Sequence, residues 1–149
     1  MVDTPYLPVM ATPAPGADGL EAPFWEATAA HRLVAQRCRS CRRFQWGPEW
    51  ICHRCHSFDL DWEEVAPEGT VYSWERSWHP VHPALVEAGP YLVVLVELAH
   101  ADGIRMVGNL LGDPAQPVAV GDPVVAEFED HEGYTLVQWR SRAAERPGD

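Results

Sequence analysis

The four cysteines are the residues whose type and spacing most clearly indicate chemistry. They form two pairs, Cys38-Arg-Ser-Cys41 and Cys52-His-Arg-Cys55, with ten residues between the pairs. Each Cys-x-x-Cys turn can direct two sulfurs at one ion, and two turns complete the four-thiolate shell of a structural zinc. The alternative is two disulfides, which is disfavoured because cysteines in such a turn are usually too close for an unstrained bridge. The spacing therefore predicts a zinc ribbon that holds one structural zinc ion per chain.

Two histidines, His53 and His56, lie in and beside the second cysteine pair. Because four thiolates already satisfy the ion, we expect neither histidine to be a ligand. A four-thiolate zinc also has no open position for water, so we expect a structural rather than a catalytic metal.

Charge is distributed unevenly along the chain. The net charge is -11, yet residues 31–56 hold six arginines and one acidic residue, Glu49. Such a chain lacks the sustained positive field that nucleic-acid binding needs. A local group of arginines can still bind one small anionic ligand. The alternative interpretation is that these arginines only offset the charge of the thiolate centre, and the sequence leaves both open.

Motifs for catalysis are scarce. All four cysteines are assigned to metal, so no thiol remains for a thiolase-type acyl intermediate. We find no nucleophile elbow, Walker loop, dinucleotide glycine motif or HExxH helix. The remaining acid–base candidates are His79 and His82 of Trp78-His-Pro-Val-His82, which are more simply interpreted as polar surface. We therefore predict no catalytic residue and expect the chain alone to show little acyl-CoA turnover.

Five segments must position these residues. The chain divides into a flexible Pro/Ala/Gly-rich arm (1–21), a helix and lead-in strand (22–37), the zinc ribbon (38–64), a barrel (65–140) and a polar tail (141–149). Within the second segment, Pro23 favours a helix start, and we expect a helix over about 23–31 and a strand over 32–37.

The barrel is predicted from hydrophobic alternation. Its five expected strands are Thr70–Trp78, Tyr91–Leu98, Ile104–Leu111, Val124–Glu129 and Tyr134–Arg140. In the first of them, alternation places Tyr72, Trp74, Arg76 and Trp78 on one face. Strand number and length indicate an OB-type barrel, and the fold class is mainly β.

Neither a membrane helix nor a secretory signal is evident in the sequence. The apolar runs are too short for a membrane helix, and the N-terminus lacks the basic and apolar regions of a signal peptide. We expect a protein of the reducing cytoplasm that does not bind membranes.

The order of these parts resembles a known family. An aromatic helix runs into Gln36-Arg-Cys-Arg-Ser-Cys41, then a ribbon, then a barrel that opens at Gly69-Thr-Val-Tyr-Ser73. Over residues 22–140 this resembles the acyl-CoA-associated OB-fold proteins with a rubredoxin-like zinc ribbon, long catalogued as a domain of unknown function. The chain departs from the family pattern at Arg42 and His56, where glycine often closes the knuckle, and at Trp46-Gly-Pro48, where two prolines are expected.

The resemblance implies a function as an accessory subunit. Such proteins accompany thiolase-like enzymes, among them lipid-transfer-type aldolases of steroid side-chain breakdown, and others accompany acyl-CoA hydratases or synthases of the mevalonate route. The partner carries the catalytic residues, and the OB protein helps form the acyl-CoA site in a hetero-oligomer.

By this analogy, a set of ribbon and barrel residues are candidates for contact with CoA or the partner: Arg37, Arg39, Arg42, Arg43, Trp46, Trp50, Trp78 and His79. Arginine suits the phosphates of CoA and aromatic rings suit its adenine. Two alternatives remain. One is a single-stranded nucleic-acid-binding module, because ribbons and OB barrels also occur there. The other is a stand-alone hydratase or hydrolase.

Overall fold

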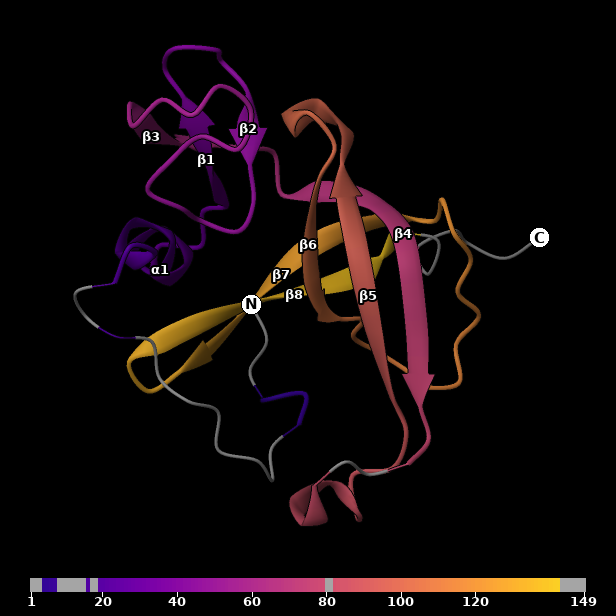
Figure 1. Cartoon of the computed structure of the whole chain (residues 1–149). Coiled ribbons are helices and arrows are strands. Elements are labelled where there is room, and N and C mark those ends of the chain that lie inside the picture. Colours follow the sequence, from indigo (N-terminus) through magenta and orange to yellow (C-terminus); the bar gives the residue numbers. More distant parts are fainter. Residues whose placement is uncertain (1–3, 8–15, 17–18, 80–81, 143–149) are drawn as a thin grey trace.

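The fold is mainly β, as predicted. The computed structural model describes residues 4–7, 16, 19–79 and 82–142, so most of the expected arm and tail lies outside the described residues. One N-terminal helix precedes a small three-stranded sheet, and a larger five-stranded sheet follows (Figure 1).

Helix α1 spans Ala22–Ala29, with Pro23 in its first turn. The prediction extended it to residue 31, but the chain turns at His31, which has a φ of 55°. The amide of Arg32 then donates back to the carbonyl of Ala27 at 2.9 Å. This is the bond of a Schellman stop, which uses a left-handed residue after the helix.

The ribbon sheet has three strands. They are β1 (Val34–Cys38), β2 (Phe44–Gln45) and β3 (Leu60–Glu64), in the order β2-β1-β3. The expected lead-in strand is therefore the central strand, and it runs into the first zinc ligand. Its antiparallel pairing with β3 places Cys38 opposite Leu60.

The larger sheet closes into a nearly complete barrel. Its strands are β4 (Glu68–Ser77), β5 (Tyr91–Leu98), β6 (Ile104–Asn109), β7 (Pro123–His131) and β8 (Tyr134–Ser141), in the order β6-β5-β4-β7-β8. The two outer strands of this order meet through a parallel bridge between Leu110 and Trp139. Short 3-10 turns, η1 (Pro83–Leu85) and η2 (Ala99–Ala101), lie before and after β5. The predicted five-stranded barrel is confirmed.

The barrel core follows the alternation of its strands. Leu92, Val94, Val96 and Leu98 of β5 are all fully buried, and Trp139 of β8 is 0% exposed. Gly108 of β6 admits the indole ring, because a Cβ at this position would lie 2.8 Å from Cδ1 of Trp139.

One predicted face was wrong. In β4, Val71 pairs with Val96 and Trp74 pairs with Val94, with a β-bulge between them. Directly opposed residues share a face of a sheet, so Val71 and Trp74 lie on the same face, which strict alternation forbids. Because of the extra residue in the bulge, Tyr72 and Trp74 do not share a face, contrary to the predicted alternation.

Candidate zinc centre and ligand cleft

The four cysteine sulfurs converge on one point. All lie within 4.8 Å of one another, and the Cys38–Cys55 and Cys41–Cys52 sulfur pairs are each 3.6 Å apart. Tetrahedral zinc with Zn–S bonds of about 2.3 Å requires sulfurs roughly 3.8 Å apart. All four cysteines are free thiols. The donor set and its spacing therefore fit one structural zinc ion.

Two matching turns hold the cysteines. The amide of Arg42 donates to the carbonyl of Cys38 at 2.9 Å, and the amide of His56 donates to that of Cys52 at 3.0 Å. Arg42 and His56 have φ values of 64° and 61°. Both therefore adopt the left-handed conformation that glycine often supplies. The departure from the family pattern leaves the turn geometry intact.

The cysteines of the cluster affect one another's ionisation. The amide of Cys41 lowers the pKa of the Cys38 thiol to about 6. The pKa of Cys55 is raised to about 12, although the amide of Ser57 lowers it, because desolvation and the neighbouring thiols oppose a further negative charge. Zinc binds cysteines as thiolates, so the metal would hold all four in the deprotonated form.

His53 and His56 lie outside this cluster, which contains only cysteines among the described residues.

A buried network of side-chain amides fixes the loop between the two cysteine turns. Gln45 donates to Oε1 of Gln36 at 2.8 Å, and the amides of Glu49 and His53 donate to Gln36 and Gln45 at 3.0 and 2.9 Å. The loop is therefore held by side chains as well as by the metal site.

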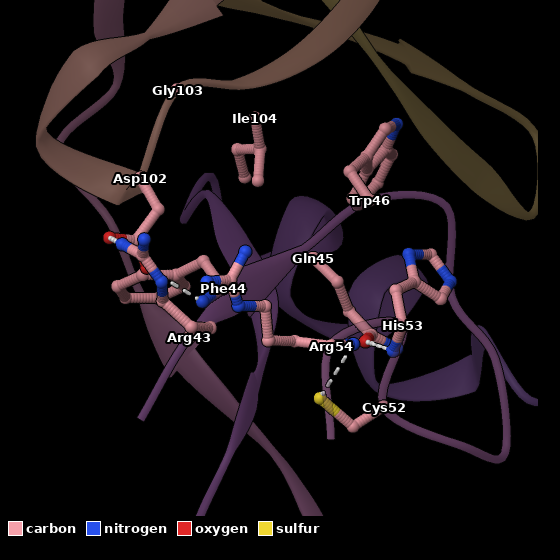
Figure 2. A pocket seen from close by; sticks show the side chains of 10 residues that line it. All are labelled: Arg43, Phe44, Gln45, Trp46, Cys52, His53, Arg54, Asp102, Gly103 and Ile104. Atoms are coloured by element: carbon pink, nitrogen blue, oxygen red, sulfur yellow. Dashed lines mark hydrogen bonds and ion pairs between the residues drawn. The ribbon is translucent and has the colours of Figure 1, made fainter. Parts of the chain in front are cut away.

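A cleft of about 320 Å³ lies between the ribbon and the barrel. Figure 2 shows Arg43, Trp46, His53 and Arg54 on the ribbon side and the turn that carries Asp102 on the barrel side. Within the described part of the chain, the Arg54 guanidinium has no ion-pair partner. The cleft thus combines an available cation with a half-buried indole, which suits an anionic ligand that carries an aromatic ring.

Asp102 joins the two modules at one side of this cleft. Its carboxylate accepts bonds from the Arg43 guanidinium at 2.7 Å and from the Phe44 amide at 2.9 Å. The Phe44 amide, followed by Arg43, holds the pKa of Asp102 below its ordinary value. Asp102 and Gly103 both have positive φ, as a tight hairpin turn requires.

Three of the predicted arginines face carboxylates of β3. Arg37 pairs with Glu63 at 2.5 Å, Arg39 pairs with Asp61 at 2.6 Å, and Arg42 lies 3.9 Å from Glu63. The hydrogen bonds that Arg39 donates to Asp61 are the main cause of its raised pKa. These three arginines therefore form a neutralised surface rather than one free positive field.

The predicted aromatic candidates are not brought together. Trp46 is half-buried and packs edge-on against Phe24 at 4.9 Å between ring centroids. Trp50 is 71% exposed and lines a different hollow. Trp78 and His79 directly follow β4, whose end lies at the opposite end of the barrel from the ribbon (Figure 1). Of the eight candidates, only Arg43 and Trp46 line the cleft.

Sequence reasoning missed two polar residues of the cleft, His53 and Arg54. From the sequence, His53 was considered only as a possible zinc ligand, and Arg54 only as one of the six arginines in residues 31–56. The available signal was their position inside the second knuckle, where a Cys-x-x-Cys turn projects the two intervening side chains away from the metal.

The remaining acid–base candidate, His82, has a structural role. Its Nδ1 accepts a bond from the amide of Ala84 at 3.1 Å and caps η1. Across the described ranges, no helix is both long and apolar enough to cross a bilayer.

Two family models match consecutive parts of the chain. The model described as the rubredoxin-like zinc ribbon domain of ChsH2 matches residues 25–61, and the C-terminal OB-fold domain of ChsH2 matches residues 62–129. A solved structure named Ltp2-ChsH2(DUF35) aldolase is 39% identical with a TM-score of 0.73, and the match covers 87% of this chain and 98% of that one. The prediction of one structural zinc is thus confirmed by both the ribbon match and the cysteine geometry.

More distant and longer relatives extend the comparison. A DUF35 protein of unknown function from Sulfolobus solfataricus shares the fold at 14% identity, with a TM-score of 0.58 over 83% of this chain and 86% of that one. A probable enoyl-CoA hydratase alpha subunit from Thermomonospora curvata is 43% identical over 70% of this chain. The 3-oxo-4,17-pregnadiene-20-carboxyl-CoA hydratase alpha subunit of Mycobacterium tuberculosis is 33% identical over 78% of this chain. The chain spans 32% and 36% of the length of these two hydratase subunits.

Proposed function

Because the chain belongs to the ChsH2 (DUF35) family, we propose that it is an accessory subunit that binds a thiolase-like aldolase and helps form its acyl-CoA site. The observation that carries this proposal is the similarity to the ChsH2 chain of a solved aldolase, which this chain covers almost completely. The catalytic residues belong to the partner in this proposal.

The cleft between ribbon and barrel is the proposed part of the CoA site. Arg54 and Arg43 suit the phosphates, and the exposed edge of Trp46 suits the adenine ring. Its volume of about 320 Å³ is near the lower limit of ligand pockets, roughly 300 Å³. It therefore holds only one end of a CoA thioester, and the partner supplies the remainder of the site.

The acyl group in this proposal is of the steroid type, and it rests on the names of the relatives alone. Both hydratase subunits are named for CoA thioesters, and one of these is a pregnadiene carboxylate, a steroid-type acyl group. Because the chain spans about a third of those proteins, we assign it no hydratase activity. A reducing cytoplasm suits a protein whose four thiols must stay available to zinc.

Nucleic-acid binding is the less favoured function. Arg37, Arg39 and Arg42 are paired with carboxylates on β3, so they do not present a free track of positive charge to a phosphate backbone.

Calorimetric titration of CoA tests the proposed cleft. The zinc-loaded chain is titrated alone and with its thiolase-like partner, and pantetheine serves as the ligand without adenosine and phosphates. We expect Arg54→Ala to weaken CoA binding about tenfold, the value of one charge-assisted contact. Arg142→Ala removes an arginine from outside the cleft and should leave binding unchanged. Equal binding of pantetheine and CoA, or no effect of Arg54→Ala, would contradict the proposed cleft.

A further inference from the structure

A second hollow of about 350 Å³ lies on the ribbon beside the start of α1. Its apolar lining consists of Leu20, Pro23, Trp50, Phe58, Leu60 and Trp62, and we call it the aromatic groove. It is separate from the CoA cleft, since the two hollows share no lining residue.

The two most exposed residues of the groove lie outside the hydrophobic core. Phe58 is 78% exposed and Trp50 is 71% exposed, the highest values among the large apolar side chains of the described residues. Neither belongs to the hydrophobic core, whereas Trp62 does pack against it. Neighbouring exposed aromatics above a packed base are typical of protein interfaces, where tryptophan is enriched among the residues that dominate binding.

The edge of the aromatic groove is acidic. Among the described residues, Glu49 is the only charged one that lines it, and its carboxylate has no hydrogen-bond or ion-pair partner among them. The carboxylate of Glu21 lies beside Gly19 at one end of the groove. By contrast, Asp61 and Glu63 of β3 are neutralised by arginines. The groove therefore combines apolar walls with unneutralised negative charge.

We propose that the aromatic groove docks a polypeptide segment of the partner subunit that inserts apolar side chains beside Trp50 and Phe58 and places a lysine or arginine against Glu49. The acidic edge selects this occupant, because a purely apolar ligand would leave Glu49 without a countercharge and this strongly acidic chain would repel a second copy. The identity of the partner rests on the proposed function; the chemistry of the segment rests on the groove.

Binding of the Ltp2-type aldolase subunit to the zinc-loaded full chain is the first test. We expect Trp50→Ala/Phe58→Ala to weaken binding by more than about tenfold, as for interface hot spots. Val120→Ser removes an apolar side chain of matching exposure, 70%, and should have no effect. Glu49→Lys should weaken binding, and more so at low salt, whereas Glu132→Lys makes the same charge change in the exposed β7–β8 turn and should not.

A photo-reactive phenylalanine analogue at position 58 then identifies the occupant. A cross-linked partner peptide that contains apolar residues with lysine or arginine supports the proposal. A cross-link to a second copy of the chain, to an acidic peptide or to a small ligand overturns it. So does unchanged aldolase binding by the Trp50→Ala/Phe58→Ala variant.

A second probe separates the groove from the proposed function. If the wild-type chain does not bind an Ltp2-type subunit, the proposed partner class fails. The groove is then judged with a labelled amphipathic leucine–lysine peptide and its leucine–glutamate counterpart. Binding of the lysine peptide that is lost in Trp50→Ala/Phe58→Ala but kept in Val120→Ser supports the groove. Binding that is unaffected by the double substitution, or absent from the wild type, overturns it.

Discussion

Replacing Asp102 with glycine should loosen the contact between ribbon and barrel by an amount that the structure lets us estimate. Asp102 has a φ of 58°, so glycine adopts this conformation without strain and the variant removes mainly the carboxylate. Loss of the acceptor for the Phe44 amide costs about 1 kcal/mol. The Arg43 pair, whose side chains are 52% and 30% exposed, adds about 0.5 kcal/mol. The total of about 1.5 kcal/mol lowers Tm by roughly 3–6 °C.

Two further substitutions separate the causes. Asp102→Asn keeps an acceptor for the amide and tolerates the backbone conformation, so it should lose only about 0.5 kcal/mol. Asp102→Ala adds the left-handed strain of roughly 1–2 kcal/mol to the loss of the carboxylate. Calorimetric or urea unfolding of the zinc-loaded variants should therefore rank the free energy of unfolding as wild type, Asn, Gly, Ala. Equal stability of the glycine variant and the wild type would refute the proposed role of the carboxylate.

The same carboxylate predicts a pH dependence. Because the pKa of Asp102 is lowered in the folded protein, its ionised form contributes stability above its unfolded pKa, about 3.9. That contribution is lost as pH falls through the lower folded pKa. The difference in unfolding free energy between wild type and Asp102→Asn should thus be constant from pH 7 to about 5 and decrease below about 4. A difference that increases on acidification would contradict this assignment.

Three other predictions concern the metal, the barrel and the helix contact. Cys52→Ser should abolish zinc binding and unfold the ribbon, since structural zinc contributes roughly 10–16 kcal/mol to folding. Metal analysis measures the bound zinc and hydrogen exchange measures the unfolding. Retention of a full zinc equivalent would contradict this prediction. Gly108→Ala should cost about 1–3 kcal/mol because its Cβ would lie 2.8 Å from Trp139, and a smaller Tm loss in a Trp139→Phe background would confirm the cause. Asp130→Asn should lower stability above pH 5 and less so below pH 4, because Thr135 first and then His31 lower the pKa of Asp130 in the folded state; urea titrations at both pH values check the sign.

Much of the architecture could be predicted because its signals are local. Two Cys-x-x-Cys turns specify their own sulfur geometry, and a two-residue period specifies a strand whatever its partner is. Local signals failed where the backbone departs from regularity. The β-bulge after Val71 adds one residue to β4, so the residues that follow lie on the opposite face from the one that alternation predicts. No residue type at that position indicates a bulge.

The candidate cleft could not be predicted from the sequence, because it brings together residues that lie far apart in the chain. Arg43 and Asp102 are separated by 59 positions. Arg54 and Trp46 lie within ten residues of each other, but only the hairpin turn of the barrel encloses them in one hollow. Residue type alone also gave no reason to prefer Arg54 over the other ribbon arginines.

The sequence by itself determined the zinc ligands, the mainly β class and the five barrel strands, since these depend on spacing over a few residues. Only the tertiary structure decided which charged side chains lack an ion-pair partner among the described residues. The register of β3 against β1 places Glu63 and Asp61 beside Arg37 and Arg39, while Arg54 and Glu49 are left without partners among the described residues. The physical reason is that a charge is neutralised by what lies within a few ångströms in space, and strand register rather than sequence distance sets that neighbourhood.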